Sequence, residues 1–139
     1  MNSYVVGFAF DHGKEHVLLI KKNRPEWQKG RYNGIGGHIE EGERPIDAMI
    51  REFAEETGYL TSEFRWHPLL KIIDNSPLHP GEIFFFYAEL DIEECRSMTD
   101  ETLLIFPVVM MDALDTIKNV QWLIPMAVDE DFKETFSIT

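Results

Sequence analysis

The alternation of apolar and polar positions predicts a β-hairpin at the start of the chain. Apolar and β-branched residues fill 4–10 and 16–20, and Asp11-His12-Gly13 between them has the composition of a turn. Three later runs also have the apolar character of strands, at 64–73, 83–90 and 103–110. The chain is therefore expected to build its sheet from segments on both sides of its centre.

The centre of the chain carries the clearest helical pattern, over about residues 45–57. Pro45 suits the first turn of a helix, and Gly58 suits its end. The apolar residues between them recur at helical spacing: Ile46, Met49, Ile50 and Phe53. A second helix is expected near the C-terminus, where it includes residues 122–128.

Strands before and after a helix predict an α/β fold, in which a mixed β-sheet carries helices on its faces. We expect an α/β/α sandwich with the 45–57 helix and the C-terminal helix packed on the sheet. No repeat, linker or low-complexity tract divides the chain, so residues 1–139 are expected to form a single domain. Three glycines in 32–37 predict a shaped loop there, because glycine permits positive φ and close backbone approach.

The composition agrees with one globular domain and limits its partners. Hydrophobic residues make up 44% of the 139, which is enough for a core. The 13 Lys and Arg against 25 Asp and Glu give a net charge of −12, which disfavours duplex nucleic acid and anionic membrane surfaces. No apolar run approaches the roughly 20 residues of a membrane-spanning helix.

Two features of the sequence favour a cytoplasmic location. The N-terminus has no basic leader followed by a small-residue cleavage site, so we expect no secretory signal. Cys95 is the single cysteine and cannot form an internal disulfide, which makes a reducing compartment the default.

Charge is unevenly distributed along the chain. Cations gather in one short stretch, which contains Lys21, Lys22, Arg24, Lys29 and Arg31. Acids dominate the segment that follows, over residues 40–56. Within it, Glu52, Glu55 and Glu56 stand at i, i+3 and i+4, so their carboxylates share one face of the predicted helix.

This face of carboxylates is locally unfavourable unless a cation neutralises it. Like charges at these spacings cost about 0.2–0.5 kcal/mol per pair. Hard oxygen ligands suit Mg²⁺ or Mn²⁺, which would also bind the phosphate oxygens of a substrate. Taken alone, however, three glutamates in one helical turn are more often a solvated face.

The spacing of the residues around this helix changes that balance. Counted from Gly37, the fixed positions are Glu43, Arg51, Glu52, Glu55, Glu56 and Gly58, with apolar Phe53 and Tyr59 among them. This arrangement resembles the Nudix box, G-x5-E-x7-R-E-U-x-E-E-x-G-U, where U is a bulky apolar residue. Every fixed position agrees, and the one departure is the aromatic Tyr59 in place of the usual aliphatic residue.

The resemblance implies a Nudix hydrolase, which cleaves a nucleoside diphosphate linked to another moiety by attack of water with Mg²⁺ or Mn²⁺. It implies that Glu52, Glu55 and Glu56 are catalytic metal ligands and that the Gly37 carbonyl adds a ligand. It further implies that Glu43 and Arg51 form a structural pair. The family gives the general base to a glutamate of the box or of a later loop, so Glu56 and Glu101 remain equal candidates here.

Glu101 lies in a short polar segment just before the expected strand at 103–110. This position resembles that of the loop glutamate in relatives. An exposed acid in such a place is, however, more often simply solvated.

The flanks of the box resemble those of Nudix enzymes that hydrolyse oxidised purine nucleoside triphosphates. In those relatives, the asparagine equivalent to Asn33 touches the base, although an asparagine here also suits a turn. Trp122 resembles the C-terminal helix region of the family and is the first candidate for stacking on a base. Lys29 and Arg31 complete the candidate substrate-binding residues.

Three functions remain open at this point. The favoured one is conversion of a purine nucleoside triphosphate, including an oxidised one, to the monophosphate and pyrophosphate. The alternative is a diphosphatase for ADP-ribose or a nucleotide sugar. A third is a nucleotide-binding sensor without catalysis, which the intact box disfavours. Because related proteins are often dimers, a homodimer is also expected.

Overall fold

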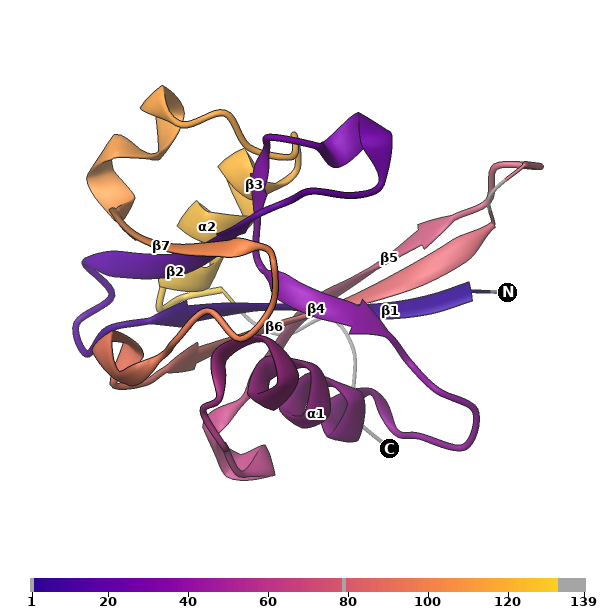
Figure 1. The fold of residues 1–139 in the computed structure, drawn as a ribbon, viewed down its shortest axis with the longest axis horizontal. Coiled ribbons are helices and arrows are strands. Elements are labelled where there is room, and N and C mark those ends of the chain that lie inside the picture. The colour runs from indigo at the N-terminus through magenta and orange to yellow at the C-terminus, as the bar shows by residue number, and fades with distance from the viewer. Residues whose placement is uncertain (1, 79, 133–139) are drawn as a thin grey trace.

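The structure is a computed structural model that describes residues 2–78 and 80–132. Its strands are β1 (Asn2–Phe10), β2 (His16–Lys21), β3 (Tyr32–Asn33), β4 (Ile35–His38), β5 (His67–Asp74), β6 (Gly81–Glu89) and β7 (Thr102–Pro107). Its α-helices are α1 (Pro45–Thr57) and α2 (Val120–Val128), and short 3₁₀ turns are η1 (Glu26–Gln28), η2 (Glu63–Arg65), η3 (Ile92–Glu94) and η4 (Val108–Ala113). Figure 1 shows their arrangement.

The strands form one seven-stranded mixed sheet with β1 at its centre. Strand β6 runs parallel to β1 along its whole length. The other edge of β1 pairs antiparallel with β2 near residues 9–10 and with β4 near residues 4–7. Strand β7 pairs with β2 along residues 16–21, β3 pairs with the opposite edge of β2 at residues 20–21, and β5 pairs with β6. The predicted hairpin and mixed sheet are confirmed.

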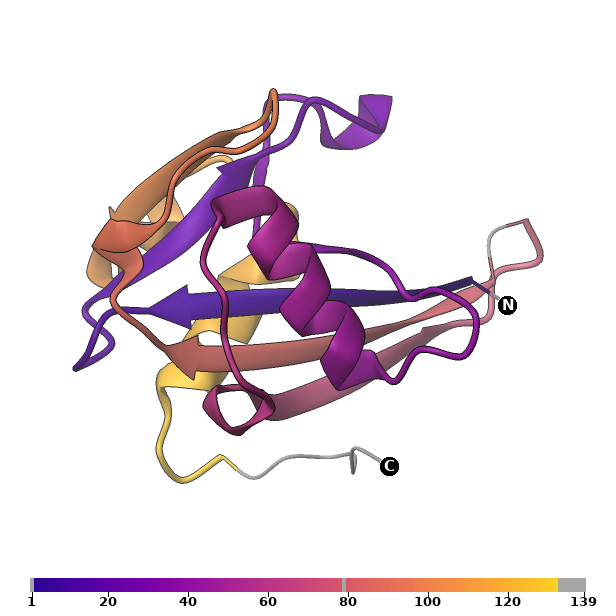
Figure 2. The same cartoon turned by 60° about the horizontal axis from the view of Figure 1, so that its bottom comes forward.

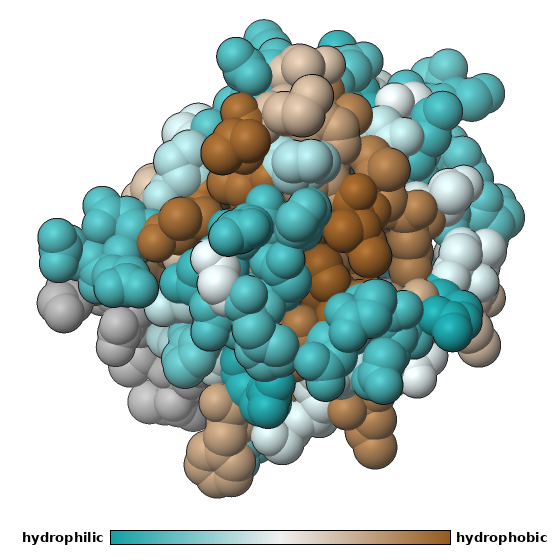
Figure 3. All heavy atoms as spheres, turned by 90° about the vertical axis from the view of Figure 1, so that its left-hand side faces the viewer, coloured by the Kyte–Doolittle hydropathy of each residue, from teal (hydrophilic) through white to brown (hydrophobic). Residues whose placement is uncertain are grey.

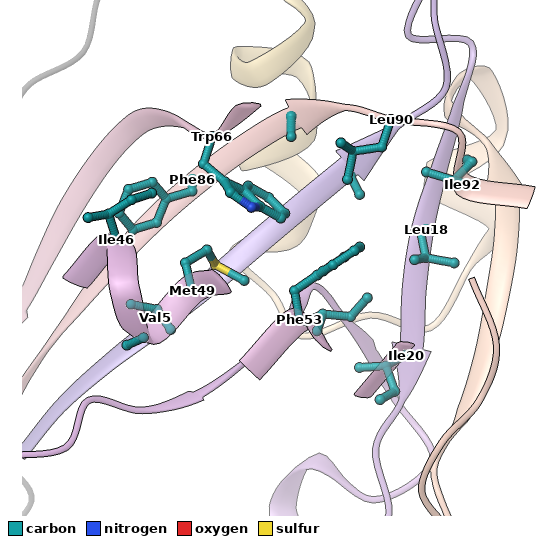
Figure 4. Packing of buried hydrophobic residues seen from close by; sticks show 14 residues of the cluster. Val5, Leu18, Ile20, Ile46, Met49, Phe53, Trp66, Phe86, Leu90 and Ile92 are labelled. Carbon is teal, nitrogen blue, oxygen red and sulfur yellow. The ribbon is translucent and has the colours of Figure 1, made fainter. Parts of the chain in front are cut away.

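The two α-helices cover opposite faces of this sheet. In Figure 2, α1 lies in front of the sheet and α2 behind it. Each face has its own apolar core: one gathers around Met49 and Phe53 of α1, the other around Leu123 and Ile124 of α2. Figure 4 shows Met49 and Phe53 pointing into the first core beside Trp66. The predicted α/β/α sandwich is therefore confirmed.

The shaped loop predicted over residues 32–37 is wrong, because most of this segment forms strands β3 and β4. In β4, Gly36 lies opposite Val6, and Gly37 opposite Val5. A Cβ at Gly36 would fall 1.8 Å from the Val5 carbonyl oxygen, so only glycine allows this approach. The glycines thus serve strand pairing rather than a loop.

Two predicted strands begin or end elsewhere. The run expected at 64–73 starts as a strand only at His67, because Glu63–Arg65 forms the 3₁₀ turn η2. The run expected at 103–110 ends at Pro107, and Val108–Ala113 continues as the 3₁₀ turn η4. Pro107 is the last residue of β7 opposite β2, where it faces His16, and the Val108 N–H still donates to the Glu15 carbonyl at 2.9 Å as the chain turns into η4.

Apolar side chains reach the surface at the end of the sheet where β7 and η4 lie. Ile105, Val109 and Met110 are exposed there. Figure 3 views this side of the molecule and shows apolar surface between hydrophilic regions. Among residues 2–78 and 80–132, no helix has both the length and the apolar character needed to cross a membrane.

Candidate active site

Helix α1 separates burial from chemistry along its length. It begins with Pro45 in its first turn and ends at Gly58, whose φ of 73° is the left-handed conformation that glycine adopts without strain. One stripe of the helix is buried against the sheet: Ile46, Ala48, Met49, Phe53 and Thr57. The carboxylates predicted at i, i+3 and i+4 lie outside this stripe.

Strand β4 runs close to α1 and places Gly37 directly against Glu52. A Cβ at Gly37 would lie 2.5–2.6 Å from the carboxylate atoms of Glu52. A larger residue at this position would therefore displace the Glu52 side chain. This contact explains in physical terms why glycine is needed at the first position of the box.

Arg51 and Glu43 form a two-pronged ion pair. Arg51 Nε donates to Glu43 Oε2 at 2.8 Å, and Arg51 Nη2 donates to Glu43 Oε1 at 2.9 Å. The bond from Arg51 lowers the pKa of the Glu43 carboxyl, so it remains ionised. The pair has the geometry expected of the structural pair implied by the sequence.

The same guanidinium also reaches two of the helix carboxylates and β4. Arg51 Nη1 donates to Glu52 at 3.0 Å and to Glu55 at 3.4 Å, and Nη2 donates to the His38 carbonyl at 2.9 Å. One side chain thus joins β4, the loop before α1 and the acidic face. Glu52 is only 14% exposed, and this burial raises the pKa of its carboxyl, with the charge of Arg51 acting in the opposite direction.

Glu56 occupies the far end of the acidic face in a different environment. Thr99 Oγ1 donates to Glu56 Oε2 at 3.0 Å. Burial is the largest cause of the raised pKa of Glu56, and the negative charge of Glu101 raises it further.

Glu101 is buried rather than exposed, with 4% of its side chain accessible. Lys22 Nζ donates to Oε1 at 3.1 Å, and the Asn23 backbone N–H donates to Oε2. The interpretation of Glu101 as an exposed, solvated acid is therefore wrong. Lys22 and Arg24 belong to the cationic stretch 21–31, and they pair with Glu101 and Asp100 instead of lying free.

The donor set fits a hard divalent cation. Three carboxylates and the Gly37 carbonyl are oxygen ligands of the kind that Mg²⁺ and Mn²⁺ prefer, and the missing Cβ of Gly37 leaves room beside Glu52. In the arrangement described for residues 2–78 and 80–132, no three acidic, His or Cys side chains already converge as a metal site. Arg51 holds both Glu52 and Glu55, so these two side chains must turn away from it before they and Glu56 can surround one ion.

The substrate-binding candidates lie on other elements than α1: Asn33 on β3, Trp122 on α2, and Lys29 and Arg31 in the segment between η1 and β3. Asn33 Oδ1 accepts the Gly34 N–H at 2.8 Å, which is the local role that the turn interpretation expected. Its neighbour Tyr32 is hydrogen-bonded to residues 115 and 117, just before α2. This pairing holds the strand of Asn33 next to the helix that carries Trp122.

The remaining substrate-binding candidates differ in their exposure to solvent and in their contacts with other residues. Trp122 is 45% exposed on α2, so part of its ring is accessible. Arg31 Nε lies 3.9 Å from Asp115 Oδ1, which ties it to the segment before α2. Lys29 is exposed at the end of η1.

Sequence analysis missed Thr99 and Lys22 as parts of the site. Thr99 is separated from Glu56 by 43 residues, and Lys22 from Glu101 by 79. Neither belongs to a periodic pattern or to the box. The one available signal was the position of Thr99 two residues before Glu101.

Comparison with known proteins identifies the family of this chain. A family model described as "NUDIX domain" matches residues 1–131. A solved MutT structure, from work on Aliivibrio salmonicida and Vibrio cholerae, is 17% identical with a TM-score of 0.76, and the match covers 91% of this chain and 96% of that one. The fold is therefore that of the MutT and Nudix proteins.

Two further solved structures have the same fold. The NUDIX domain of Shewanella oneidensis NrtR, solved with ADP ribose, is 18% identical with a TM-score of 0.75, over 90% of this chain and 84% of that one. A MutT/nudix family protein from Enterococcus faecalis is 20% identical with a TM-score of 0.65, over 76% of this chain. This chain spans only 43% of the Enterococcus protein.

The layered fold and the acidic helix define the class of this protein as a Nudix-type hydrolase. The chain belongs to the NUDIX domain family, whose members generally use a divalent metal.

Proposed function

We propose that this protein uses Mg²⁺, with Mn²⁺ as a substitute, to hydrolyse a purine nucleoside triphosphate to the monophosphate and pyrophosphate. The substrate class includes oxidised purine nucleotides. One observation carries the proposal: Glu52 lies against Gly37 and is held by Arg51, while Glu55 and Glu56 share its helix face. These residues supply hard oxygen donors from one face of a rigid helix and from the strand beside it.

The chain supplies positioning and charge rather than a covalent nucleophile. When bound, Mg²⁺ neutralises diphosphate oxygens and activates water. Glu52, Glu55, Glu56 and the Gly37 carbonyl would hold the ion. Arg51 and Glu43 fix the acidic face relative to β4, since their two-pronged pair spans the loop before α1.

We assign the general base to Glu56 in preference to Glu101. Both carboxylate oxygens of Glu101 already accept hydrogen bonds from Lys22 and Asn23. Glu56 Oε2 accepts the Thr99 hydroxyl, which leaves Oε1 as the atom to take the proton from water. Glu101 then remains the second candidate, acting only if its partners move.

The base of the substrate would bind between β3 and α2. The Asn33 amide can donate through Nδ2 to a purine edge while its Oδ1 accepts the Gly34 N–H. Trp122 would stack on the base with its exposed part. Lys29 and Arg31 would attract the phosphates as cations near this edge of the sheet.

ADP-ribose or a nucleotide sugar is the second candidate substrate. The observation that favours it is the fold similarity to the NUDIX domain of NrtR, which was solved with ADP ribose. Both candidates require the same metal ligands and differ in the bond that is cleaved.

The proposal extends to the domain organisation, location and partners of the protein. We place residues 1–139 in a single Nudix hydrolase domain that acts in the cytoplasm as a homodimer. Its partner is a small nucleotide, not duplex nucleic acid or a membrane, because the net charge of −12 repels anionic polymers and surfaces at long range.

The proposal is tested with a panel of nucleoside triphosphates, oxidised purine triphosphates, ADP-ribose and nucleotide sugars, each with and without Mg²⁺. We expect Mg²⁺-dependent pyrophosphate release from a purine triphosphate by wild type and none by Glu56→Gln. Cleavage of ADP-ribose to AMP alone would move the assignment to the second candidate. Nucleotide binding without turnover of any compound would instead identify a sensor.

A parallel pair of variants tests the base-binding residues. Asn33→Ala and Trp122→Leu are expected to raise KM for the purine substrate more than they lower kcat, because they remove ground-state contacts. Unchanged KM for both variants would place the base elsewhere.

A further inference from the structure

The segment at residues 96–101 is fastened to the C-terminal end of α1. The Arg96 N–H donates to the Thr57 carbonyl at 2.9 Å, and the Met98 N–H donates to the Glu56 carbonyl at 3.1 Å. These bonds satisfy two of the carbonyls that a helix end leaves without a partner within the helix. The backbone of Glu56 therefore helps to position this segment, and the side chain of the same residue belongs to the candidate site.

Thr99 connects this segment to the Glu56 side chain. Its hydroxyl donates to Glu56 Oε2 at 3.0 Å and accepts the Glu101 N–H at 3.2 Å. A hydroxyl that both donates and accepts has a fixed direction, so the carboxylate that it meets is held in one orientation. The Ser97 hydroxyl, two residues earlier, donates to the Glu101 carbonyl at 2.6 Å and to the Thr99 carbonyl at 3.4 Å.

The other side of the segment is anchored in the protein interior. Glu101 is buried and accepts hydrogen bonds from Lys22 Nζ and from the Asn23 N–H, which follow directly after β2. The Asn23 side-chain amide donates to the Asp100 carbonyl at 2.9 Å. Thr99 is thus held between a buried ion pair and the helix, although its own side chain is exposed.

We infer that Thr99 is a positioning residue that orients the Glu56 carboxylate toward the divalent cation through its Oγ1. This inference rests on the proposed function, since it requires Glu56 to be a metal ligand. Groups that hydrogen-bond a ligating side chain fix its orientation, and their loss weakens metal binding by about 10- to 100-fold. The hydroxyl is the part of Thr99 that does this, and its methyl group is dispensable.

A purely structural role for Thr99 would have different consequences. In that case, loss of the hydroxyl would disturb the whole segment, and loss of the neighbouring Ser97 hydroxyl would do the same. If Thr99 acts on Glu56, only changes at position 99 affect the metal. Ser97→Ala is therefore the matched control, because it removes a hydrogen bond of the same segment without touching Glu56.

The experiment measures Mn²⁺ binding to the metal-free protein, by electron paramagnetic resonance of free Mn²⁺, for five proteins. They are wild type, Thr99→Val, Thr99→Ser, Ser97→Ala and, as the reference for loss of the ligand itself, Glu56→Gln. Thermal unfolding of each reports whether it is folded. Thr99→Ala replaces Thr99→Val if the latter fails to fold.

We expect Thr99→Val to bind Mn²⁺ about tenfold more weakly than wild type. Thr99→Ser and Ser97→Ala should each bind Mn²⁺ within about twofold of the wild-type affinity. Wild-type affinity in Thr99→Val overturns the inference while leaving the metal site intact. An equal loss in Ser97→Ala also overturns it, because the effect then belongs to the segment. No saturable Mn²⁺ binding by wild type, with Glu56→Gln identical to it, refutes the proposed function itself.

Discussion

Helices α1 and α2 cover opposite faces of the same sheet but present different surfaces. Helix α1 buries one stripe and carries Glu52, Glu55 and Glu56 outside it. Helix α2, with the sequence VQWLIPMAV, contains no charged residue, and it buries Val120, Leu123, Ile124 and Ala127. Helix α1 therefore contributes ionisable side chains as well as core residues, whereas α2 contributes mainly core residues.

The difference shows how a small domain separates stability from function. On the α2 face, almost every apolar residue of the helix serves the core or its margin. On the α1 face, three acidic residues share one side of the helix despite their repulsion, and the charge of Arg51 offsets part of that repulsion. An arrangement that is unfavourable without a cation is expected at a functional site rather than in a structural layer.

The largest expected effect is on activity, from a change on α1. Glu52→Gln should lower kcat by about a thousandfold, equivalent to about 4 kcal/mol, because it removes a charge that holds the cation. Far-ultraviolet circular dichroism and steady-state kinetics measure fold and turnover together. Glu41→Gln, at an exposed glutamate outside the fixed positions of the box, is the control and should retain activity. A folded Glu52→Gln protein with wild-type kcat contradicts the proposed site.

The next effect is on stability, from a change on α2. Leu123 is fully buried, so Leu123→Ala should lower the free energy of unfolding by about 3 kcal/mol through lost transfer energy and cavity formation. Urea denaturation measures it. The folded fraction should keep the wild-type kcat. Val109→Ala, at a 90% exposed position, should change stability by less than about 0.5 kcal/mol. A kcat loss in folded Leu123→Ala would break the division between the two faces.

A smaller effect is expected from the group that links α1 to β4. Arg51→Lys keeps the charge but loses the two-pronged bond to Glu43 and the bond to the His38 carbonyl. Mn²⁺ affinity should fall by about 10- to 100-fold. Arg44→Lys breaks a similar pair with Asp47 at the exposed start of α1 and should leave Mn²⁺ affinity unchanged. Equal affinity for wild type and Arg51→Lys would remove Arg51 from the organisation of the site.

The smallest effect concerns pH and Glu56 in the metal-free protein. Because burial raises the pKa of the folded-state carboxyl above its unfolded value, the folded state is favoured at low pH and loses stability as pH rises through the raised pKa. Glu56→Gln removes this loss. Its Tm should therefore exceed that of wild type slightly at pH 7 and equal it near pH 4. Saturating Mg²⁺ should reverse the order at pH 7, because only wild type then has its full set of ligands. A lower Tm for metal-free Glu56→Gln at pH 7 would contradict the raised pKa.

Much of the fold could be predicted from local patterns. The hairpin of β1 and β2 and the full extent of α1 follow from short-range periodicity and from the residues at the helix ends. The errors occurred where long-range contacts decide the structure. The segment 32–37 has too few apolar residues to predict a strand. Its pairing with β1 depends on glycines that fit against a backbone far away in the sequence.

The candidate site divides in the same way. Helical spacing predicted the acidic face, and the resemblance to the Nudix box implied the partnership of Glu43 with Arg51. The surroundings of Glu56 could not be predicted, because Thr99 and Glu101 approach it from a segment more than 40 residues away.

By itself, the sequence determined that Glu52, Glu55 and Glu56 share one face of α1, because helical spacing alone places them there. The tertiary structure decided which of those carboxylates are buried and what each contacts. Strand β4 brings Gly37 against Glu52, and the segment after η3 brings Thr99 to Glu56. Burial and hydrogen bonding depend on elements that meet only in the folded chain. Burial raises the pKa of Glu52 and of Glu56, and hydrogen bonds from Arg51 and Thr99 orient these two side chains.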